Sequence, residues 1–188
     1  EHRVPTPKDP EALTRAIVDA VEALGRPVAS LGIGIAGLVT VTGHVRVSPH
    51  LAEPERLDLR GRLGDHFGVE VRVDNDANAA CWGEARLGAG RGSQDLVVVT
   101  LGTGIGAGIV CNGRLVRGAH GFAGEPGHMV VDPDGLRCPC GRRGCWERYA
   151  SGSALGRLGQ EAVERGEGGA ILDAAGGVVD HVRGEHVV

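Results

Sequence analysis

Aromatic residues are scarce in this sequence, at 3% of its 188 residues, and several signals that mark particular classes of protein are missing. No apolar run approaches the ~20 residues of a membrane span. No charged segment followed by an apolar core opens the chain, so we expect no secretion signal. Lys and Arg number 20 against 24 Asp and Glu, without a basic block. We therefore expect a cytoplasmic globular protein with a mainly aliphatic core and no nucleic-acid or membrane partner.

Glycine, in contrast, is abundant, with 33 residues, and it predicts many tight turns and close approaches between backbone segments. Apolar residues at three- and four-residue steps predict helices at residues 10–24, 57–67, 77–87 and from 153 onward, and Asp9 before Pro10 is the predicted cap of the first. Strand patterns occupy residues 30–40, 45–47, 69–73, 96–101 and 105–110, and Thr42-Gly43 and Asn112-Gly113 predict turns between strands. The segments 30–40 and 96–101 have the pattern of buried strands. Strands alternate with helices, which indicates the α/β class.

Three of the five cysteines lie in one short segment, CPCGRRGC (138–145). Cys138 and Cys140 flank a single proline, which is a poor geometry for a disulfide between them. Nothing marks the chain as secreted, so a disulfide framework is disfavoured. Three thiols in a glycine-bent loop, with His128 ten residues before Cys138, match the Cys₃His set of a structural zinc site that Cys145 completes. Reduced thiols without a metal are the alternative.

A glycine-rich segment, TLGTGIGAGIV (100–110), joins two predicted strands. Its spacing fits a loose dinucleotide-binding fingerprint, but that motif must open a helix, and here a strand follows. Gly102, Thr103 and Gly104 instead form the tip of a hairpin, where backbone N–H groups and a hydroxyl can hold phosphate oxygens. No P-loop lysine accompanies them. An ordinary glycine-rich hairpin is the alternative interpretation.

Asp74, Asn75 and Asp76 lie where a predicted strand ends and a predicted helix begins. Helix capping would need only one of them. The functional interpretation is a carboxylate placed to accept a proton, beside an amide that can both donate and accept hydrogen bonds. The pattern alone leaves capping and catalysis open.

Taken together, these segments make the sequence resemble the ROK family of bacterial sugar kinases and sugar-responsive repressors. That family has the two-lobed actin/hexokinase-like ATPase fold, built on a ribonuclease H-like motif. The resemblance extends to about residue 158. It is carried by GIGIAGLV (32–39), DNDANAACWGE (74–84), TLGTGIGAGIV (100–110), GEPGHM (124–129) and CPCGRRGCWERYASG (138–152).

The resemblance implies roles for individual residues. Asp76 would be the base that takes the proton from the 6-hydroxyl of a hexose. Gly102, Thr103 and Gly104 would form the second of two phosphate loops for ATP with Mg²⁺. Substrate contacts are implied for Gly37, Asn75, Asp76, Glu125, His128 and Glu147.

The family also implies one structural Zn²⁺, which shapes the sugar pocket. Its ligands would be His128, Cys138, Cys140 and Cys145. Because Glu147 follows the last cysteine so closely, we expect the metal to fix the loop and the loop to aim this glutamate at the sugar. Gly37 would let the backbone approach the sugar ring.

The family's lobes would divide at residues 76–77. Residues 1–76 would be the remainder of the N-terminal lobe, with residues 1–5 as the tail of a strand. Residues 77–188 would be the C-terminal lobe, with the zinc-binding loop at about 118–152. The family's first phosphate hairpin, Asp-x-Gly-Gly-Thr, and its adenosine-contacting part are absent. We therefore expect an incomplete fold, truncated at both ends, that is inactive by itself.

The resemblance implies an ATP-dependent hexose kinase acting on the 6-hydroxyl, first of all a glucokinase, in carbohydrate metabolism and glycolysis. A ROK-type repressor without its DNA-binding domain is one alternative, and an N-acetylhexosamine kinase is another. Asp76 favours a kinase, because a repressor has no need of a base. Dimers are common in the family, so a homo-oligomer is expected.

Overall fold

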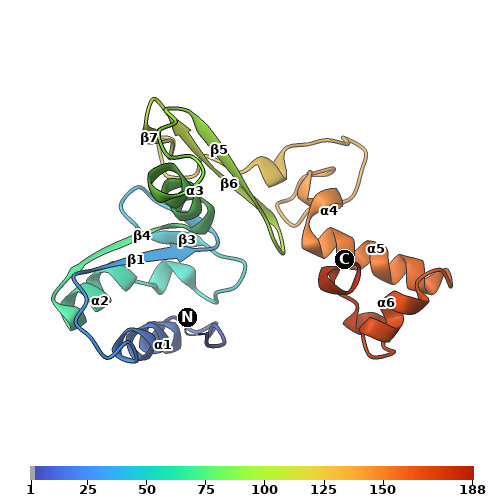
Figure 1. The fold of residues 1–188 in the computed structure, drawn as a ribbon, viewed down its shortest axis with the longest axis horizontal. Coiled ribbons are helices and arrows are strands. Elements are labelled where there is room, and N and C mark those ends of the chain that lie inside the picture. Colours follow the sequence, from blue (N-terminus) through green and yellow to red (C-terminus); the bar gives the residue numbers. More distant parts are fainter. Residues whose placement is uncertain (1–2) are drawn as a thin grey trace. The chain divides into compact units, whose positions relative to one another are not determined.

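The computed structural model describes residues 3–188 and divides into two compact units (Figure 1). The first unit extends to residue 98 and includes residues 108–124, and the second comprises residues 99–107 and 125–188. The predicted lobe boundary at residues 76–77 concerns the family's fold and stays a prediction.

The first unit is built on two parallel strands, β1 (Ser30–Ile35) and β4 (Glu70–Asn75), with Ile35 opposite Asn75. Three helices belong to it: α1 (Pro10–Glu22), α2 (Leu59–Phe67) and α3 (Asp76–Leu87). α1 begins at Pro10 as predicted, because the Asp9 carboxylate caps it. α3 begins one residue before the predicted start, and its cap is Asn75. A short 3₁₀ helix, η1 (Pro54–Arg56), precedes α2.

An aliphatic core holds these elements together, as the scarcity of aromatic residues predicted. Leu59 and Leu63 of α2 are almost fully buried. They belong to one cluster of buried side chains with Leu13, Val39, Val45, Leu57, Val71 and Val73. Burying a leucine or valine side chain typically contributes about 1.5–3 kcal/mol. This core therefore fixes the ends of β1 and β4, where the candidate catalytic residues lie.

The prediction of one buried strand over residues 30–40 was wrong. The segment forms β1 and then β2 (Leu38–Val39), which pairs with β3 (Val45–Val47) around the predicted turn at residues 42–43. Gly37 breaks the strand with φ +138°, and a side chain there would collide with the carbonyl oxygen of Val47. A continuous apolar pattern does not reveal such a break, because it records side-chain type and not backbone conformation.

Three strands, β5 (Leu96–Leu101), β6 (Ile105–Cys111) and β7 (Arg114–Leu115), form a sheet in that order. The turn between β6 and β7 is the predicted Asn112-Gly113 pair, with φ +50° and +71°. Full burial of β5 was predicted wrongly, since Val97 and Leu101 are 61% and 69% exposed. An apolar run alone cannot separate a strand buried on one face from one buried on both.

The second unit is helical and loop-rich. Its helices are α4 (Glu147–Ala150), α5 (Gly152–Glu164) and α6 (Gly169–Ala174). Its 3₁₀ helices are η2 (Pro126–His128), η3 (Val179–His181) and η4 (Gly184–His186). The Ser151 hydroxyl caps α5 by accepting a hydrogen bond from the Ala154 N–H. Glycines on α5 allow close packing, because a side chain at Gly156 would meet the backbone of Arg183.

Residues 3–5 form no strand, so the expected strand tail at residues 1–5 is not found there. Residues 1 and 2 lie outside the described residues. The first strand in the part of the chain that the structure describes is β1, which begins at Ser30. Between residues 3 and 188, no helix is both long and apolar enough to cross a membrane.

Candidate active site and metal centre

A cluster of four potential metal ligands lies in the second unit. One ligand atom each from His128, Cys138, Cys140 and Cys145 lies within 4.8 Å of the others. Cys138 Sγ is 3.6 Å from His128 Nδ1, and Cys140 Sγ is 3.6 Å from Cys145 Sγ. Sulfur ligands ~2.3 Å from a tetrahedral zinc lie about 3.7 Å apart, so the donor set and its spacing fit this ion. All five cysteines are free thiols.

Backbone contacts bring the ligands together. The Trp146 N–H donates to the Met129 carbonyl oxygen at 2.8 Å, which holds the last cysteine beside the histidine. The Cys138 N–H donates to the Arg142 carbonyl oxygen, also at 2.8 Å. Gly144 has φ +67°, and a side chain there would collide with the carbonyl oxygen of Asp132. The glycines between the cysteines are therefore needed for the loop's shape, as the sequence predicted.

The thiols of the cluster differ in acidity. Burial and hydrogen bonds with Cys140 and Cys138 raise the pKa of the Cys145 thiol to about 12. Partial burial also pushes the pKa of Cys140 upward, but hydrogen bonds from the Arg142 backbone and from the other two thiols outweigh it. The pKa of Cys140 therefore lies below the ordinary thiol value. A metal that binds here must displace thiol protons, so its affinity falls as the pH falls.

Glu147, the first residue of α4, reaches the glycine hairpin that follows β5. Its Oε2 accepts a hydrogen bond from the Ile105 N–H at 2.8 Å, and a side chain at Gly104 would collide with the same oxygen. The sequence predicted a sugar contact for Glu147 and not this one. Because Cys145 is two residues away, the metal loop directly places the carboxylate on the hairpin.

The start of α5 holds the tip of the same hairpin. The N–H groups of Gly152 and Ser153 donate to the carbonyl oxygens of Gly102 and Thr103 at 2.8 and 3.2 Å. The Ser153 hydroxyl donates to the Thr103 carbonyl oxygen at 2.8 Å. Among residues 3–188, no hydrogen bond occupies the N–H groups of Thr103 and Gly104. These two donors are therefore available for an anionic ligand.

An open groove of about 770 Å³ borders this tip within the second unit. The side chains with polar groups that line it are Thr103, Tyr149, Ser151, Ser153, Arg183 and Glu185. The sequence analysis missed the last two, which are more than thirty residues from the nearest recognised motif residue. No spacing rule connects residues so far apart.

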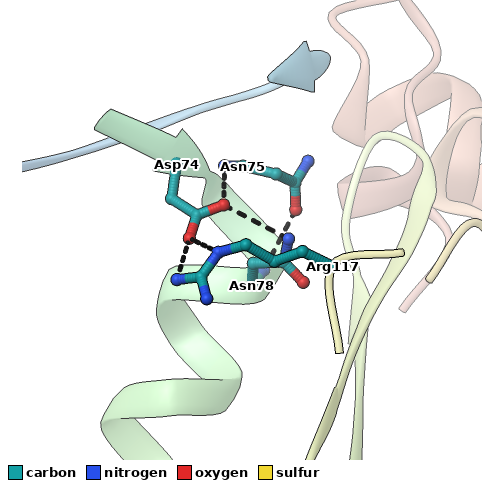
Figure 2. Close-up of polar contacts among 4 residues, drawn as sticks. All are labelled: Asp74, Asn75, Asn78 and Arg117. Carbon is teal, nitrogen blue, oxygen red and sulfur yellow. Dashed lines mark hydrogen bonds and ion pairs between the residues drawn. The ribbon is translucent and has the colours of Figure 1, made fainter. Parts of the chain in front are cut away.

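The corner between β4 and α3, in the first unit, contains the predicted residues Asp74, Asn75 and Asp76, and Figure 2 shows the first two with their polar contacts. Asn75 caps α3, because its Oδ1 accepts a hydrogen bond from the Asn78 N–H at 3.0 Å. Its Nδ2 donates to the Gly37 carbonyl oxygen at 3.1 Å. An amide has two N–H groups and two lone pairs, so one of each is left for a ligand.

Asp76 is the first residue of α3 and is exposed. Its Oδ1 accepts a hydrogen bond from the Ala77 N–H at 2.9 Å, and no other partner of the carboxylate occurs in the described chain. The capping and catalytic interpretations of the Asp-Asn-Asp motif thus fall on different residues. Asn75 is the cap, and Asp76 has a carboxylate oxygen available.

The residues predicted to contact a sugar are distributed over both units. Gly37, Asn75 and Asp76 belong to the first, and Glu125, His128 and Glu147 to the second. The hydrogen bonds described for each group lie within its own unit. Gly37 has a structural reason to be glycine, its contact with the Val47 carbonyl oxygen, and its approach to a sugar ring stays a prediction. Glu125 is exposed just before η2.

Comparisons with known proteins identify the family of this chain. The sequence matches the ROK family over residues 1–179. The chain belongs to the ROK family. It is 43% identical over 193 aligned residues to a glucokinase of Streptomyces coelicolor, covering 99% of this chain and 60% of the relative. This ROK chain therefore spans less than two thirds of that relative's length.

Two further comparisons define its neighbours in the family. A ROK family glucokinase from Streptomyces griseus, solved in complex with glucose and AMPPNP, superposes with a TM-score of 0.86 at 42% identity. The match covers 98% of this chain and 61% of that one. A xylose repressor of Bacillus subtilis is 40% identical over 131 residues, covering 69% of this chain and 34% of the relative. The chain accordingly has the actin/hexokinase-like α/β fold of the family.

Proposed function

We propose that this ROK chain belongs to an ATP-dependent hexose kinase that phosphorylates the 6-hydroxyl of its sugar substrate, and that this substrate is glucose. The observation that carries the proposal is the environment of Asp76. Its carboxylate is exposed at the start of α3, accepts a hydrogen bond from its neighbour's N–H and lies next to the capping Asn75. Similarity to glucokinases at 42–43% identity supports the same reaction.

In the proposed reaction, an Asp76 oxygen accepts the proton of the sugar 6-hydroxyl while the hydroxyl oxygen forms its bond to the γ-phosphorus of ATP. The bond from that phosphorus to the bridging oxygen breaks, and ADP leaves. General-base assistance of this kind typically contributes about 10²–10⁴-fold. Most of the remaining acceleration in phosphoryl transfer comes from positioning and charge neutralisation, the latter from Mg²⁺ bound with the nucleotide.

Other residues of the chain would position the reactants. The N–H groups of Thr103 and Gly104 would donate to phosphate oxygens, and the remaining amide groups of Asn75 would bond sugar hydroxyls. Glu125, His128 and Glu147 are proposed to bind the hydroxyls on the reducing-end side of the sugar. Gly37 is proposed to border the ring.

We further propose that His128, Cys138, Cys140 and Cys145 bind one structural zinc ion. Four protein ligands fill its coordination, so it has no open position for activating water. Its contribution is to hold the loop that carries Glu147. A cytoplasmic location and a homodimer belong to the same proposal, and light scattering on the purified protein tests the oligomeric state.

A sugar-responsive repressor is the second candidate, because the xylose repressor of Bacillus subtilis is 40% identical over 131 residues. Asp76 favours the kinase, since sugar binding alone needs no base. An N-acetylhexosamine kinase would use the same base on a sugar that differs at its 2-position.

The test is ADP release by a protein that includes these 188 residues, measured with glucose, mannose, N-acetylglucosamine and N-acetylmannosamine. We expect turnover with glucose. Asp76→Asn keeps the shape of the side chain and removes the base, so turnover should fall about 10²-fold or more while glucose affinity stays within about tenfold. If the protein binds glucose but releases no ADP with any of the four sugars, the repressor is favoured.

A further inference from the structure

Two aspartates flank Asn75, and the structure gives them very different surroundings; Figure 2 shows those of Asp74. The Asp74 Oδ2 accepts hydrogen bonds from Nε and Nη2 of Arg117 at 2.9 and 2.7 Å. Its Oδ1 accepts from the Asn75 N–H at 2.8 Å and from the Asn78 Nδ2 at 3.3 Å. A carboxylate has about four acceptor sites, so Asp74 is saturated. Asp76, in contrast, accepts one hydrogen bond, from its neighbour.

Arg117 belongs to neither β4 nor α3, the two elements whose junction contains Asp74. It follows β7 and lies 43 residues from Asp74 in the sequence, yet within the same compact unit. The Asp74 side chain is 20% exposed and that of Arg117 is 42% exposed. Two parallel N–H groups of a planar guanidinium fix the carboxylate in position as well as in charge.

The Asp74 carboxylate passes this constraint on to its neighbours. It holds the Asn75 N–H, where β4 ends, and the side chain of Asn78, which is 1% exposed. The Asn78 Oδ1 has no partner in the described chain, so its Nδ2 bond to Asp74 anchors this buried amide. The Asn78 N–H in turn donates to the Asn75 side chain. Hydrogen bonds thus fix both the backbone N–H and the side chain of Asn75, and Asp76 is the next residue.

We propose that Arg117 is a positioning residue for phosphoryl transfer, acting through Asp74 to fix Asn75 and the first turn of α3 and so to orient the Asp76 carboxylate. The inference rests on the proposed kinase function. Arg117 also neutralises Asp74, which leaves Asp76 as the carboxylate of this corner without a cationic partner in the described chain. The ion pair therefore selects which of the two aspartates serves as the base.

Removal of Arg117 has a predictable consequence. Asp74 would keep its charge in a mostly buried place without its cationic partner, with only the hydrogen bonds from Asn75 and Asn78 left, which is unfavourable. The carboxylate would rotate toward water and release the Asn75 N–H and the Asn78 amide. Asp76 would lose its fixed backbone, and a misplacement of ~1 Å in a reacting group can lower a rate by ~10²-fold.

The test compares Arg117→Met, Asp74→Asn and the double variant in a protein that includes this chain, with turnover, KM values and melting temperature measured for each. We expect Arg117→Met to lower kcat by about tenfold or more while KM for ATP changes by less than about threefold. The double variant leaves no unpaired charge, so its kcat should be no lower than that of the worse single variant. Arg117→Lys keeps the charge without the fork and should recover part of the loss.

Arg72→Met is the matched control. Arg72 pairs with Glu70 on the same strand at 2.8 Å, but the two side chains are 82% and 63% exposed. The kcat and melting temperature of Arg72→Met should equal those of the unmodified protein, because exposed ion pairs contribute little to stability.

Two results overturn the inference while the proposed function stands: an Arg117→Met kcat within twofold of the unmodified value, or losses that add up in the double variant. A loss of kcat that only follows the folded fraction at the assay temperature would likewise reduce Arg117 to a stabilising role. If the unmodified protein transfers no phosphate to any hexose, the proposed function fails first and the inference fails with it.

Discussion

The metal loop (residues 127–147) and the corner between β4 and α3 are both small polar clusters, but they are assembled from different distances along the chain. The four ligands of the loop lie within residues 128–145. At the corner, Asp74 is held by Arg117 from 43 residues away, and Asn75 is held to Gly37 from 38 residues away. Local spacing is enough to predict the first cluster, whereas the second exists only because the core brings separate segments together.

Removal of the metal should have the greatest effect, and it should change the metal loop without changing the corner between β4 and α3. Structural zinc typically contributes about 10–16 kcal/mol of apparent binding free energy, and the loop has little apolar core of its own. Cys140→Ser should abolish zinc binding and expose the amides of residues 127–147 to hydrogen exchange, while α3 stays protected. Metal analysis and hydrogen exchange measure both. Cys111→Ser, at an exposed cysteine outside the cluster, is the control. Zinc retained after replacement of all three loop cysteines would contradict the assignment.

A second prediction compares two glycines within the loop. Gly144 has φ +67° and also lies against the Asp132 carbonyl oxygen, whereas Gly141 has φ +91° and open space around it. We expect Gly144→Ala to lower the free energy of unfolding by about 2–3 kcal/mol and Gly141→Ala by only about 1–2 kcal/mol. Denaturant titration of the zinc-loaded protein measures the difference. Equal losses would show that backbone strain alone, and not the close approach, restricts Gly144.

A third prediction concerns the contact between the loop and the glycine hairpin. Glu147→Ala removes the acceptor of the Ile105 N–H, which as a charge-assisted bond should stabilise the hairpin by about 1.5–3 kcal/mol. Hydrogen exchange at Ile105 should become about tenfold faster or more, and Glu147→Gln, which keeps an acceptor oxygen, should recover much of the protection. Glu161→Ala on α5 is the control. Unchanged exchange at Ile105 would mean that the strand ladder alone holds the turn.

The prediction with the smallest effect compares two helix caps, Asp9 and Asn75, of which only Asn75 is proposed to bind sugar as well. Asp9 and Asn75 cap α1 and α3 in the same way, so replacing either by alanine should lower stability by about 1 kcal/mol. Under the proposed function, only Asn75→Ala should also weaken glucose binding. Calorimetric titration with glucose measures it. Equal glucose affinity in both variants would limit Asn75 to capping.

Features that depend on neighbours in the chain could be predicted from the sequence. Asp9 before Pro10 predicted the start of α1, Asn112-Gly113 predicted the turn between β6 and β7, and the cysteine spacing predicted the metal cluster. Each of these is set by backbone geometry or ligand chemistry over a few residues, which is visible in a linear pattern.

The remaining features could not be predicted from local sequence patterns. The bond of Glu147 to Ile105, the collision that makes Gly37 a strand break and the exposure of alternate residues in β5 all depend on segments far apart in sequence. The same holds for the two aspartates beside Asn75, which the sequence presents as equivalent acids. The physical reason for their difference is a guanidinium that packing brings to one carboxylate and not to the other, so that Asp74 is saturated while Asp76 keeps an oxygen available.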